Sequence, residues 1–287
     1  MTDKIETHVI RELMNDWRSK VKVSLSEDAK EYVVTGDERV PADVTLPRVT
    51  GILNIIEKQG LRTWAMDMAL EHIREEFRLF QHKYEPGRRP TFPLDKVLID
   101  ARQANEQKRD TAADFGTEAH ALLQQLYLDP DTAVPEEFRT VVDSWDKWMT
   151  ESGLEVIATE QQLYYHDSTS RNSPVSFAGT ADLIAVDANG IPVVCDYKTG
   201  SRVYAEYSLQ MAAYTLALTY CGIGNFLNAR DASLTRAFVV RLPKEEGKDI
   251  EVKEVNDVLA QQEAFIHACK LRQWQSGRSK WVRNPKR

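Results

Sequence analysis

The sequence predicts an α/β protein in which a mixed β-sheet is flanked by helices and preceded by a helical N-terminal portion. Two observations lead to this fold class. As far as Ser152, apolar residues recur mainly with the helical period of about 3.6 residues, and after Gly153 they recur with the strand period of two. Helical segments then return between and after the strand-like ones, which indicates that the sheet and the helices share one core.

The N-terminal portion, residues 1–93, is predicted to be mainly helical. Its first 45 residues mix a short helical pattern with a strand-like segment at residues 31–35. Two helices and a loop rich in Pro, Gly and Arg are expected after it, at residues 50–60, 63–80 and 84–93.

Residues 94–287 are predicted to form the main core with a basic C-terminal tail, continuous with the N-terminal portion in one globule. Helices are expected at residues 94–128, 136–152, 204–221 and 256–274. Strands are expected at residues 155–166, 177–187, 191–199, 235–242 and 250–255.

The second and third of these strands are predicted to form a hairpin, because Ala188-Asn189-Gly190 separates them. A three-residue loop would place Asp182 opposite Asp196, so that both carboxylates lie on one face of the sheet. A two-residue turn at Asn189-Gly190 would instead place Asp182 opposite Tyr197 and put the acids on opposite faces.

The composition is that of a globular protein, with 42% hydrophobic and 28% charged residues in a chain of 287. No apolar run reaches the roughly 18 residues that a membrane span needs. The N-terminal sequence MTDKIETHVIRELMNDW is charged throughout and lacks the apolar centre of a secretory signal. We therefore expect a cytoplasmic location, in a cell or in a phage-infected cell, and no membrane partner.

The formal net charge of −7 argues against a protein that coats nucleic acid by charge alone. It does not argue against an enzyme of nucleic acid, because bound cations neutralise catalytic carboxylates locally. The three cysteines are scattered, which excludes a disulfide framework or a four-thiol metal site within the chain. They are expected to be buried as small apolar residues.

Four polar residues fall where the strand pattern predicts burial, namely Glu160, Asp182, Asp196 and Lys198. A buried charge is costly unless it is paired or binds a metal. Asp196 and Lys198 are two residues apart and project from the same face of their strand. Two carboxylates beside a cation can hold one or two Mg²⁺ or Mn²⁺ ions next to a phosphate, and a lysine can stabilise charge on that phosphate.

These residues belong to longer motifs. The motifs are Gly116-Thr117-Glu118-Ala119-His120, Gly179-Thr180-Ala181-Asp182-Leu183-Ile184, Val194-Cys195-Asp196-Tyr197-Lys198-Thr199-Gly200, and Gln210 with Tyr214. In this order the motifs resemble the RecB-type branch of the PD-(D/E)XK nucleases, whose restriction-endonuclease-like core is a mixed sheet flanked by helices. The first 90 residues loosely resemble phage and mitochondrial single-strand exonucleases of this branch, and the motifs also resemble nucleases of CRISPR adaptation.

The resemblance implies a role for each residue. The metal ligands would be His120, Asp182, Asp196 and the backbone carbonyl of Tyr197. Glu160 would lie at the edge of the metal site, and Lys198 would act in catalysis together with these acids. Gln210, Tyr214 and Thr180 would order the site and contact the substrate. Two features of relatives are missing, the cysteine quartet of an iron–sulfur cluster and the GxxxxGK[ST] loop of helicase fusions.

The C-terminal segment, residues 270–287, contains seven Lys or Arg and no acid, with Trp274 and Trp281 between them. Basic residues interleaved with aromatic ones favour single-stranded nucleic acid. A solubilising tail on a packed helix explains the same pattern, and the sequence leaves both interpretations open.

The sequence thus predicts a metal-dependent DNA exonuclease of recombination, repair or replication, of cellular or phage origin, acting on DNA that is single-stranded or has a free end. One alternative is a structure-specific endonuclease on the same fold. Another is a catalytically inactive nuclease fold that serves as a DNA-binding subunit, against which the intact set of His120, Asp182, Asp196 and Lys198 argues.

Overall fold

The computed structural model describes residues 7–28, 30–41, 44–56, 59–85, 87, 90–167, 169, 175–223 and 235–277. The chain divides into two compact units. One comprises Met1–Ile56 and His120–Arg287, and the other comprises Glu57–Ala119. The helix α4 (Leu94–Leu128) has residues in both units, and its bounds agree with the prediction.

The smaller unit consists of α3 (Gln59–Lys83) and the first part of α4. Phe92 packs its ring edge-on against Phe77 and Phe80, with ring centroids 5.2 Å apart in both pairs. The described residues of the predicted loop at 84–93 form no helix or strand. The predicted helix at 63–80 is present, but α3 extends beyond it at both ends.

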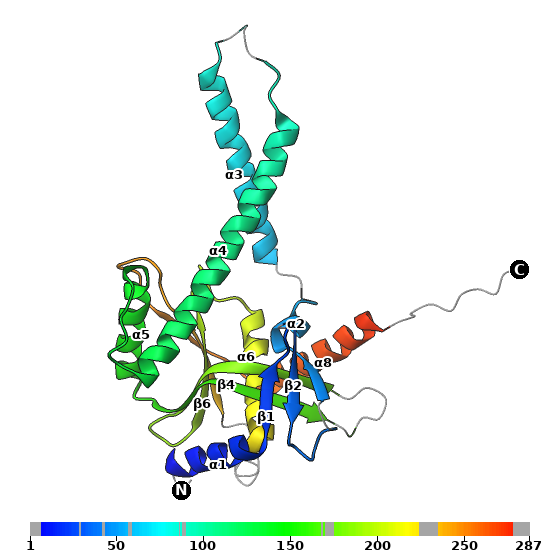
Figure 1. The fold of residues 1–287 in the computed structure, drawn as a ribbon, viewed down its shortest axis with the longest axis vertical. Helices are drawn as coiled ribbons and strands as arrows, with labels where there is room; N and C mark the ends of the chain where they lie inside the picture. The colour runs from blue at the N-terminus through cyan, green and yellow to red at the C-terminus, as the bar shows by residue number, and fades with distance from the viewer. Residues whose placement is uncertain are drawn as a thin grey trace, which may run out of the picture. The chain divides into compact units, whose positions relative to one another are not determined.

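The larger unit is built on a five-stranded mixed sheet, of which Figure 1 labels β4 and β6. The strand order is β4-β5-β6-β7-β8. All neighbouring strands are antiparallel except β6 and β7, which are parallel. Parallel neighbours need a long crossover, and α6 (Glu206–Leu218) lies between these two in sequence. The strands are β4 (Glu155–Asp167), β5 (Val175–Val186), β6 (Pro192–Lys198), β7 (Arg236–Arg241) and β8 (Glu251–Glu254).

The mixed sheet and the flanking helices confirm the predicted fold class, and each predicted strand agrees with an observed one to within two residues at either end. Further helices in the described residues of the larger unit are η1 (Glu136–Phe138), α5 (Arg139–Ser152) and α8 (Val258–Ser276). Gly153 ends α5 with φ of 62°, in the left-handed region that glycine favours at this position. Asp257 caps α8, accepting a hydrogen bond from the backbone N–H of Ala260.

The N-terminal segment contains α1 (Thr7–Lys20) and a separate antiparallel sheet of β1 (Lys22–Leu25), β2 (Glu31–Thr35) and β3 (Val44–Pro47). The sequence predicted only the strand at residues 31–35. The strands β1 and β3 were missed because each has four residues and one buried side chain, which is too little for a period of two to be seen. In α1, Arg11 donates a hydrogen bond to the backbone oxygen of Val156, so this helix lies along β4.

The length of the helix predicted at residues 50–60 was wrong. The observed helix is α2 (Val49–Leu53), which starts one residue earlier and is much shorter. It ends early because Ile55 and Ile56 bond back to carbonyls three residues before them, a tightening that closes the last turn. Gly60, the last residue of the predicted range, lies in α3.

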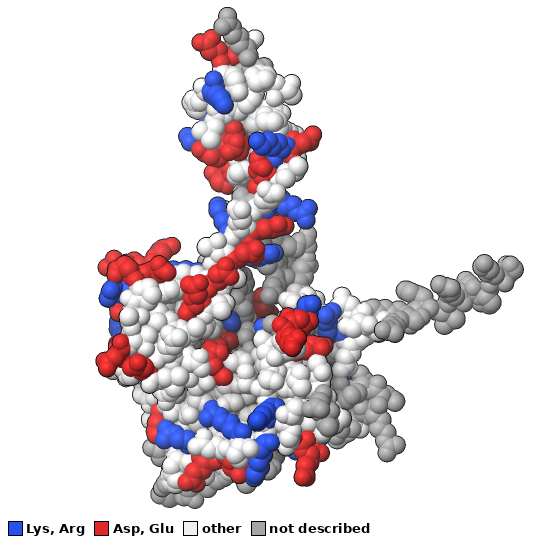
Figure 2. Space-filling view, viewed as in Figure 1, with Lys and Arg blue, Asp and Glu red and all other residues white. Residues whose placement is uncertain are grey.

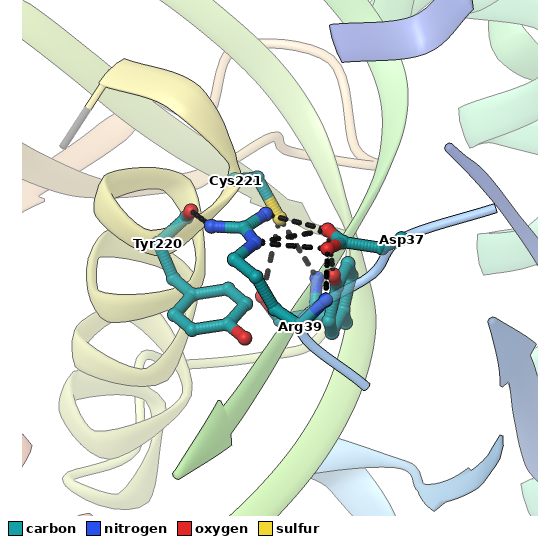
Figure 3. Close-up of polar contacts among 5 residues, drawn as sticks. Asp37, Arg39, Tyr220 and Cys221 are labelled. Carbon is teal, nitrogen blue, oxygen red and sulfur yellow. Dashed lines mark hydrogen bonds and ion pairs between the residues drawn. The ribbon is translucent and has the colours of Figure 1, made fainter. Parts of the chain in front are cut away.

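A polar network joins the segment after β2, the strand β4 and the π-helical segment η2 (Thr219–Ile223) that follows α6 (Figure 3). Asp37 accepts hydrogen bonds from the Arg39 guanidinium and from the Tyr164 hydroxyl. Arg39 also donates to the backbone oxygen of Tyr220 at 2.7 Å and lies 4.2 Å from the centre of its ring. Cys221 donates to the backbone oxygen of Tyr164. These contacts hold the segment after β2, the strand β4 and the segment η2 against one another.

The three cysteines Cys195, Cys221 and Cys269 are buried and free, as predicted. Among the helices that the structure describes, none is long and apolar enough to cross a membrane.

Candidate active site

The loop between β5 and β6 determines whether the acids share a face. Asp187 pairs with Ile191 through a backbone hydrogen bond of 2.9 Å, so three residues form the loop. Gly190 in this loop has φ of 77°, the left-handed conformation that such loops require. The register of the strand pair, continued by one residue, places Asp182 opposite Asp196. The three-residue loop that the chemistry requires is confirmed.

A third acid joins this row from β4. Thr159 pairs with Leu183 and Gln161 pairs with Ala181, so Glu160 stands opposite Asp182. Glu160 has φ of 45°, a left-handed backbone that costs about 1–3 kcal/mol for a residue other than glycine. The strand is also irregular a few residues earlier, where the register shifts between Val156 and Ala158. Strained backbone of this kind is common where a side chain is needed in one position.

Three of the predicted site residues form a group that could hold a metal ion. One ligand atom from each of His120, Glu160 and Asp182 lies within 4.8 Å of the others. The Nδ1 atom of His120 is 3.4 Å from Oδ2 of Asp182, which also accepts a 2.6 Å hydrogen bond from the backbone N–H of Tyr197. Asp182 is therefore the centre of this group.

Asp196 lies beside this group and has its own partners. Gln210 of α6 donates a 2.8 Å hydrogen bond to Oδ1 of Asp196, and the Lys198 ammonium forms an ion pair with Oδ2. The same amide of Gln210 lies 3.0 Å from the hydroxyl of Tyr214. Gln210 and Tyr214, one helical turn apart, thus hold Asp196 in place from α6.

Tyr207 is a neighbour of the site that the sequence reasoning missed. Its ring centre lies 4.9 Å from the Lys198 ammonium, close enough for a cation–π interaction. The spacing of Tyr207, Gln210 and Tyr214 at i, i+3 and i+7 puts all three on one helical face, and this pattern could have revealed it.

The remaining predicted residues are placed as follows. The hydroxyl of Thr180 is 2.8 Å from the hydroxyl of Tyr32 in β2. The ring of Tyr197 is buried against His120 and Trp148. Trp274, near the end of α8, is 63% exposed. Trp281 lies outside the described residues.

Burial and crowding shift the proton affinities of these groups. Burial and the nearby Asp182 raise the pKa of Glu160 to about 7, and burial raises the pKa of Asp196 to about 6. Burial alone would lower the pKa of His120, but the Asp182 carboxylate raises it to about 9. Asp182 itself has a lowered pKa, because His120 and Lys198 outweigh the effect of its burial.

The residues fit a hard divalent cation. Two carboxylates and an imidazole, from Asp182, Glu160 and His120, converge in one partly buried place beside Asp196, and oxygen ligands are what such ions prefer. The Oδ2 atom of Asp196 is buried and has no hydrogen bond from the described residues, so an acceptor remains there besides its ion pair with Lys198. A cation would relieve both the repulsion among the acids and the burial of their charge.

Acids on three neighbouring strands, with a lysine two residues after the last, form an arrangement that suits a divalent cation beside a phosphate. A comparison of the sequence with known protein families points to the same kind of site. Residues 80–285 match the PD-(D/E)XK nuclease superfamily, and the chain belongs to this superfamily. Its nucleases use divalent metal ions and act on nucleic acid.

No curated protein is significantly similar to this chain in sequence. Among solved structures, the crystal structure of SSO0001 is similar at 13% identity, with a TM-score of 0.32. The alignment covers 48% of this chain and 58% of SSO0001, so the chain matches little more than half of that protein's length.

Proposed function

We propose that this protein is a metal-dependent DNA exonuclease of the RecB-type branch, acting on strand ends in recombination, repair or replication. The observation that carries the proposal is the row of Glu160, Asp182 and Asp196 across three adjacent strands, with Lys198 paired to the last acid. An inactive nuclease fold that only binds DNA has no need to keep this row together with the strained backbone at Glu160.

Metal binding is assigned to His120, Asp182 and Asp196, with Glu160 at the edge and the backbone carbonyl of Tyr197 as a further ligand. When bound, Mg²⁺ or Mn²⁺ would offset phosphate charge and lower the pKa of a coordinated water. Gln210 and Tyr214 position Asp196 through the bonds described above. An aligned carboxylate costs no reorganisation when the reaction occurs.

Lys198 is assigned the role of a transition-state stabiliser. Burial alone would lower its pKa, but Asp196 and Asp182 raise it, so the side chain stays a charged ammonium at neutral pH. A charge held in a buried site is screened little by solvent, so it acts strongly on the oxygens of a phosphate undergoing attack. Tyr207 keeps the ammonium on the side of α6 by its ring contact.

The substrate is proposed to be DNA that is single-stranded or has a free end. Thr180, beside Asp182 in β5, is assigned to substrate together with Gln210 and Tyr214. Trp274 and Trp281 are assigned to stacking on bases, which the exposure of the Trp274 ring supports. Deleting the residues after Trp274 is expected to weaken DNA affinity and flatten its salt dependence.

The test is digestion of end-labelled linear and circular DNA, single- and double-stranded, with Mg²⁺, Mn²⁺ or EDTA. An exonuclease releases label from linear strands in the presence of metal and leaves circles intact. Cleavage of circles would indicate the endonuclease alternative. Tight binding of DNA without cleavage of any substrate, DNA or RNA, would support the inactive-subunit alternative. The Lys198→Ala variant is the control for contaminating nuclease.

A further inference from the structure

A groove of about 700 Å³ opens beside Glu160, within the larger unit. One wall is formed by the end of α1 and by β1, from Trp17 to Ser24. The floor is β4, from Ile157 to Gln162, and the other wall is the last turn of α4, at Gln124, Tyr127 and Leu128. Glu160 belongs both to this groove and to the group of possible metal ligands. The groove and the candidate active site therefore share a residue.

The helix α4 is a second connection, besides Glu160, between the groove and the candidate active site. His120, Gln124, Tyr127 and Leu128 stand at i, i+4, i+7 and i+8, which is one face of a helix. The first of them contacts Asp182, and the other three line the groove. A polymer whose reacting phosphate lay at Asp182 would thus meet Glu160 and this helix face as it passes into the groove.

The charges of the groove suit a polyanion. Arg18 and Lys22 line it, and within the described residues neither forms an ion pair. Arg18 is instead positioned by a neutral partner, because its Nε donates a 2.6 Å hydrogen bond to Gln161. Lys20, between them in sequence, is different, since it pairs with Asp16 at 2.8 Å. Figure 2 shows Lys and Arg side chains gathered over α1 and β1 on this face.

Unpaired cations are notable on a chain with a net charge of −7. Arg18 is exposed at the surface, and within the described residues no carboxylate pairs with it; partial desolvation of its guanidinium lowers its pKa. An anionic ligand would supply the missing partner. The remaining lining is divided between polar side chains and apolar ones, with Glu160 as the one acid among the described residues that line it, at the end next to the metal-ligand group. Tyr127 on the wall is 39% exposed. Cations along a groove with an aromatic ring are the arrangement that binds single strands.

We propose that this groove holds the single-stranded DNA segment adjoining the scissile phosphate, with Arg18 and Lys22 on its phosphates and Tyr127 stacked on a base. The inference rests on the proposed nuclease function and adds the path of the strand. It also gives the N-terminal segment a role, because α1 and β1 form the basic wall.

The experiment measures binding by the full chain of a 5′-fluorescein-labelled 20-nucleotide single strand, by anisotropy in EDTA, where metal-dependent cleavage is absent. The Arg18→Gln/Lys22→Gln variant is expected to bind about tenfold more weakly at 50 mM salt. The slope of log K against log salt should become shallower by about 1.4, which is the loss of two phosphate contacts to a single strand. Lys20→Gln removes one positive charge at the end of α1 without changing the lining of the groove, and it should leave both values unchanged.

A second pair of variants tests stacking. Tyr127→Ala should weaken binding at least about fivefold, while Tyr127→Phe, which keeps a ring, should bind like the wild type. If the double variant does not fold, as judged by circular dichroism, the exposed Lys22→Glu is used in its place and should change the slope in the same direction.

Failure of the inference and failure of the proposed function are distinguishable. Wild type that cleaves DNA with metal, and variants whose salt slope equals that of wild type, would overturn the groove and leave the nuclease function standing. If the double variant loses as much affinity for a blunt duplex as for the single strand, the assignment of the groove to single strands is wrong. Wild type that neither binds nor cleaves any DNA would overturn both. Binding of Mn²⁺, measured by calorimetry, should be the same in the double variant, because the metal-ligand group is untouched.

Discussion

Asp182 and Tyr197 are joined across the central hairpin, where the backbone N–H of Tyr197 donates a 2.6 Å hydrogen bond to Oδ2 of Asp182. The backbone pairing of β5 with β6 extends only to Leu183 and Cys195, so beyond that point a side chain connects the strands. The carboxylate of Asp182 therefore has two functions, one as a structural acceptor and one as a charged ligand candidate.

These two functions are separable by substitution. Asp182→Asn keeps an acceptor for Tyr197 but removes the negative charge, whereas Asp182→Ala removes both. Both variants should lose metal binding and turnover. Asp182→Asn should be more stable than Asp182→Ala by about 1–3 kcal/mol, because only the alanine leaves a buried N–H unsatisfied. Urea unfolding and Mn²⁺ calorimetry measure the two effects. Equal stability of the variants would show that the hydrogen bond from Tyr197 to Asp182 does not contribute to the stability of the fold.

Lys198→Ala should separate metal binding from catalysis. The acids remain, so the affinity for Mn²⁺ should persist, while kcat should fall by roughly 10²-fold or more, the scale of losing one transition-state stabiliser. Asp196→Ala provides the contrast, since it should lose both properties. A Lys198→Ala variant that retains full single-turnover cleavage would remove the lysine from the mechanism.

Metal binding should release protons in a pH-dependent number. The pKa of His120 is raised to about 9, so at pH 8 a bound metal must displace its proton. The pKa of Glu160 is about 7, so at pH 6.5 a second proton is displaced and the count should rise towards two. Metal affinity should therefore fall as the pH falls.

Calorimetry in buffers of different ionisation enthalpy counts these protons. His120→Ala is the matched variant and should abolish the release at pH 8. Affinity for Mn²⁺ that is constant from pH 6.5 to 8.5 would contradict a ligand role for both residues.

Gly179→Ala should disturb the candidate active site indirectly, by displacing Tyr214. A Cβ atom at this position would lie 2.5 Å from Cε1 of Tyr214 and 3.3 Å from Cγ2 of Val49, so the tyrosine must move. Overpacking of this kind costs about 1–3 kcal/mol, and the displaced ring would loosen the Gln210 bond to Asp196.

The control for this substitution is Gly200→Ala, because nothing within the described residues lies within 4 Å of a Cβ there. A double-mutant cycle with Tyr214→Ala identifies the clash, since the alanine at position 179 should cost less once the ring is absent. If the effects of the two substitutions are additive, the destabilisation by Gly179→Ala does not come from a clash with Tyr214.

The hydrogen bonds to Asp37 should make the free energy of unfolding depend on pH in the acidic range. Burial opposes ionisation of Asp37, but hydrogen bonds from Arg39 and Tyr164 outweigh it and lower its pKa from 3.8 to about 2. A depressed pKa contributes stability above pH 3.8 that is lost as the pH falls towards 2. The difference in unfolding free energy between wild type and Asp37→Asn should thus be constant above pH 5 and shrink between pH 4 and 3. A difference that does not change over this range would show that Asp37 titrates normally.

The sequence alone was enough to predict the central sheet and the charged residues that lie together on it. The strands β4 to β8 were predictable because their apolar residues show the strand period and turn residues bound them. The acids Glu160, Asp182 and Asp196, with Lys198, stood out because charge on a buried strand is costly without a purpose. Even the three-residue hairpin loop followed from the requirement that Asp182 and Asp196 share a face.

Local pattern did not reveal contacts between distant segments. The strands β1 and β3 were missed because they are short and mostly exposed, so pairing with β2 rather than periodicity makes them strands. The spacing of Tyr207 from Gln210 and Tyr214 could have marked it as a neighbour of the site, but its contact with Lys198 depends on how α6 packs on β6. The hydrogen bond from Tyr164 to Asp37 likewise joins segments that are far apart in the sequence.

The tertiary structure also decided which acids lie together. Sequence spacing placed Asp182 and Asp196 on one face, but the fold groups Asp182 with His120 and Glu160 and gives Asp196 to Lys198 and Gln210. Glu160 joins the first group from a left-handed backbone, and the backbone N–H of Tyr197 bonds to the Asp182 carboxylate. The positive φ of Glu160 is held by the tertiary structure, because a residue other than glycine would by itself favour another conformation.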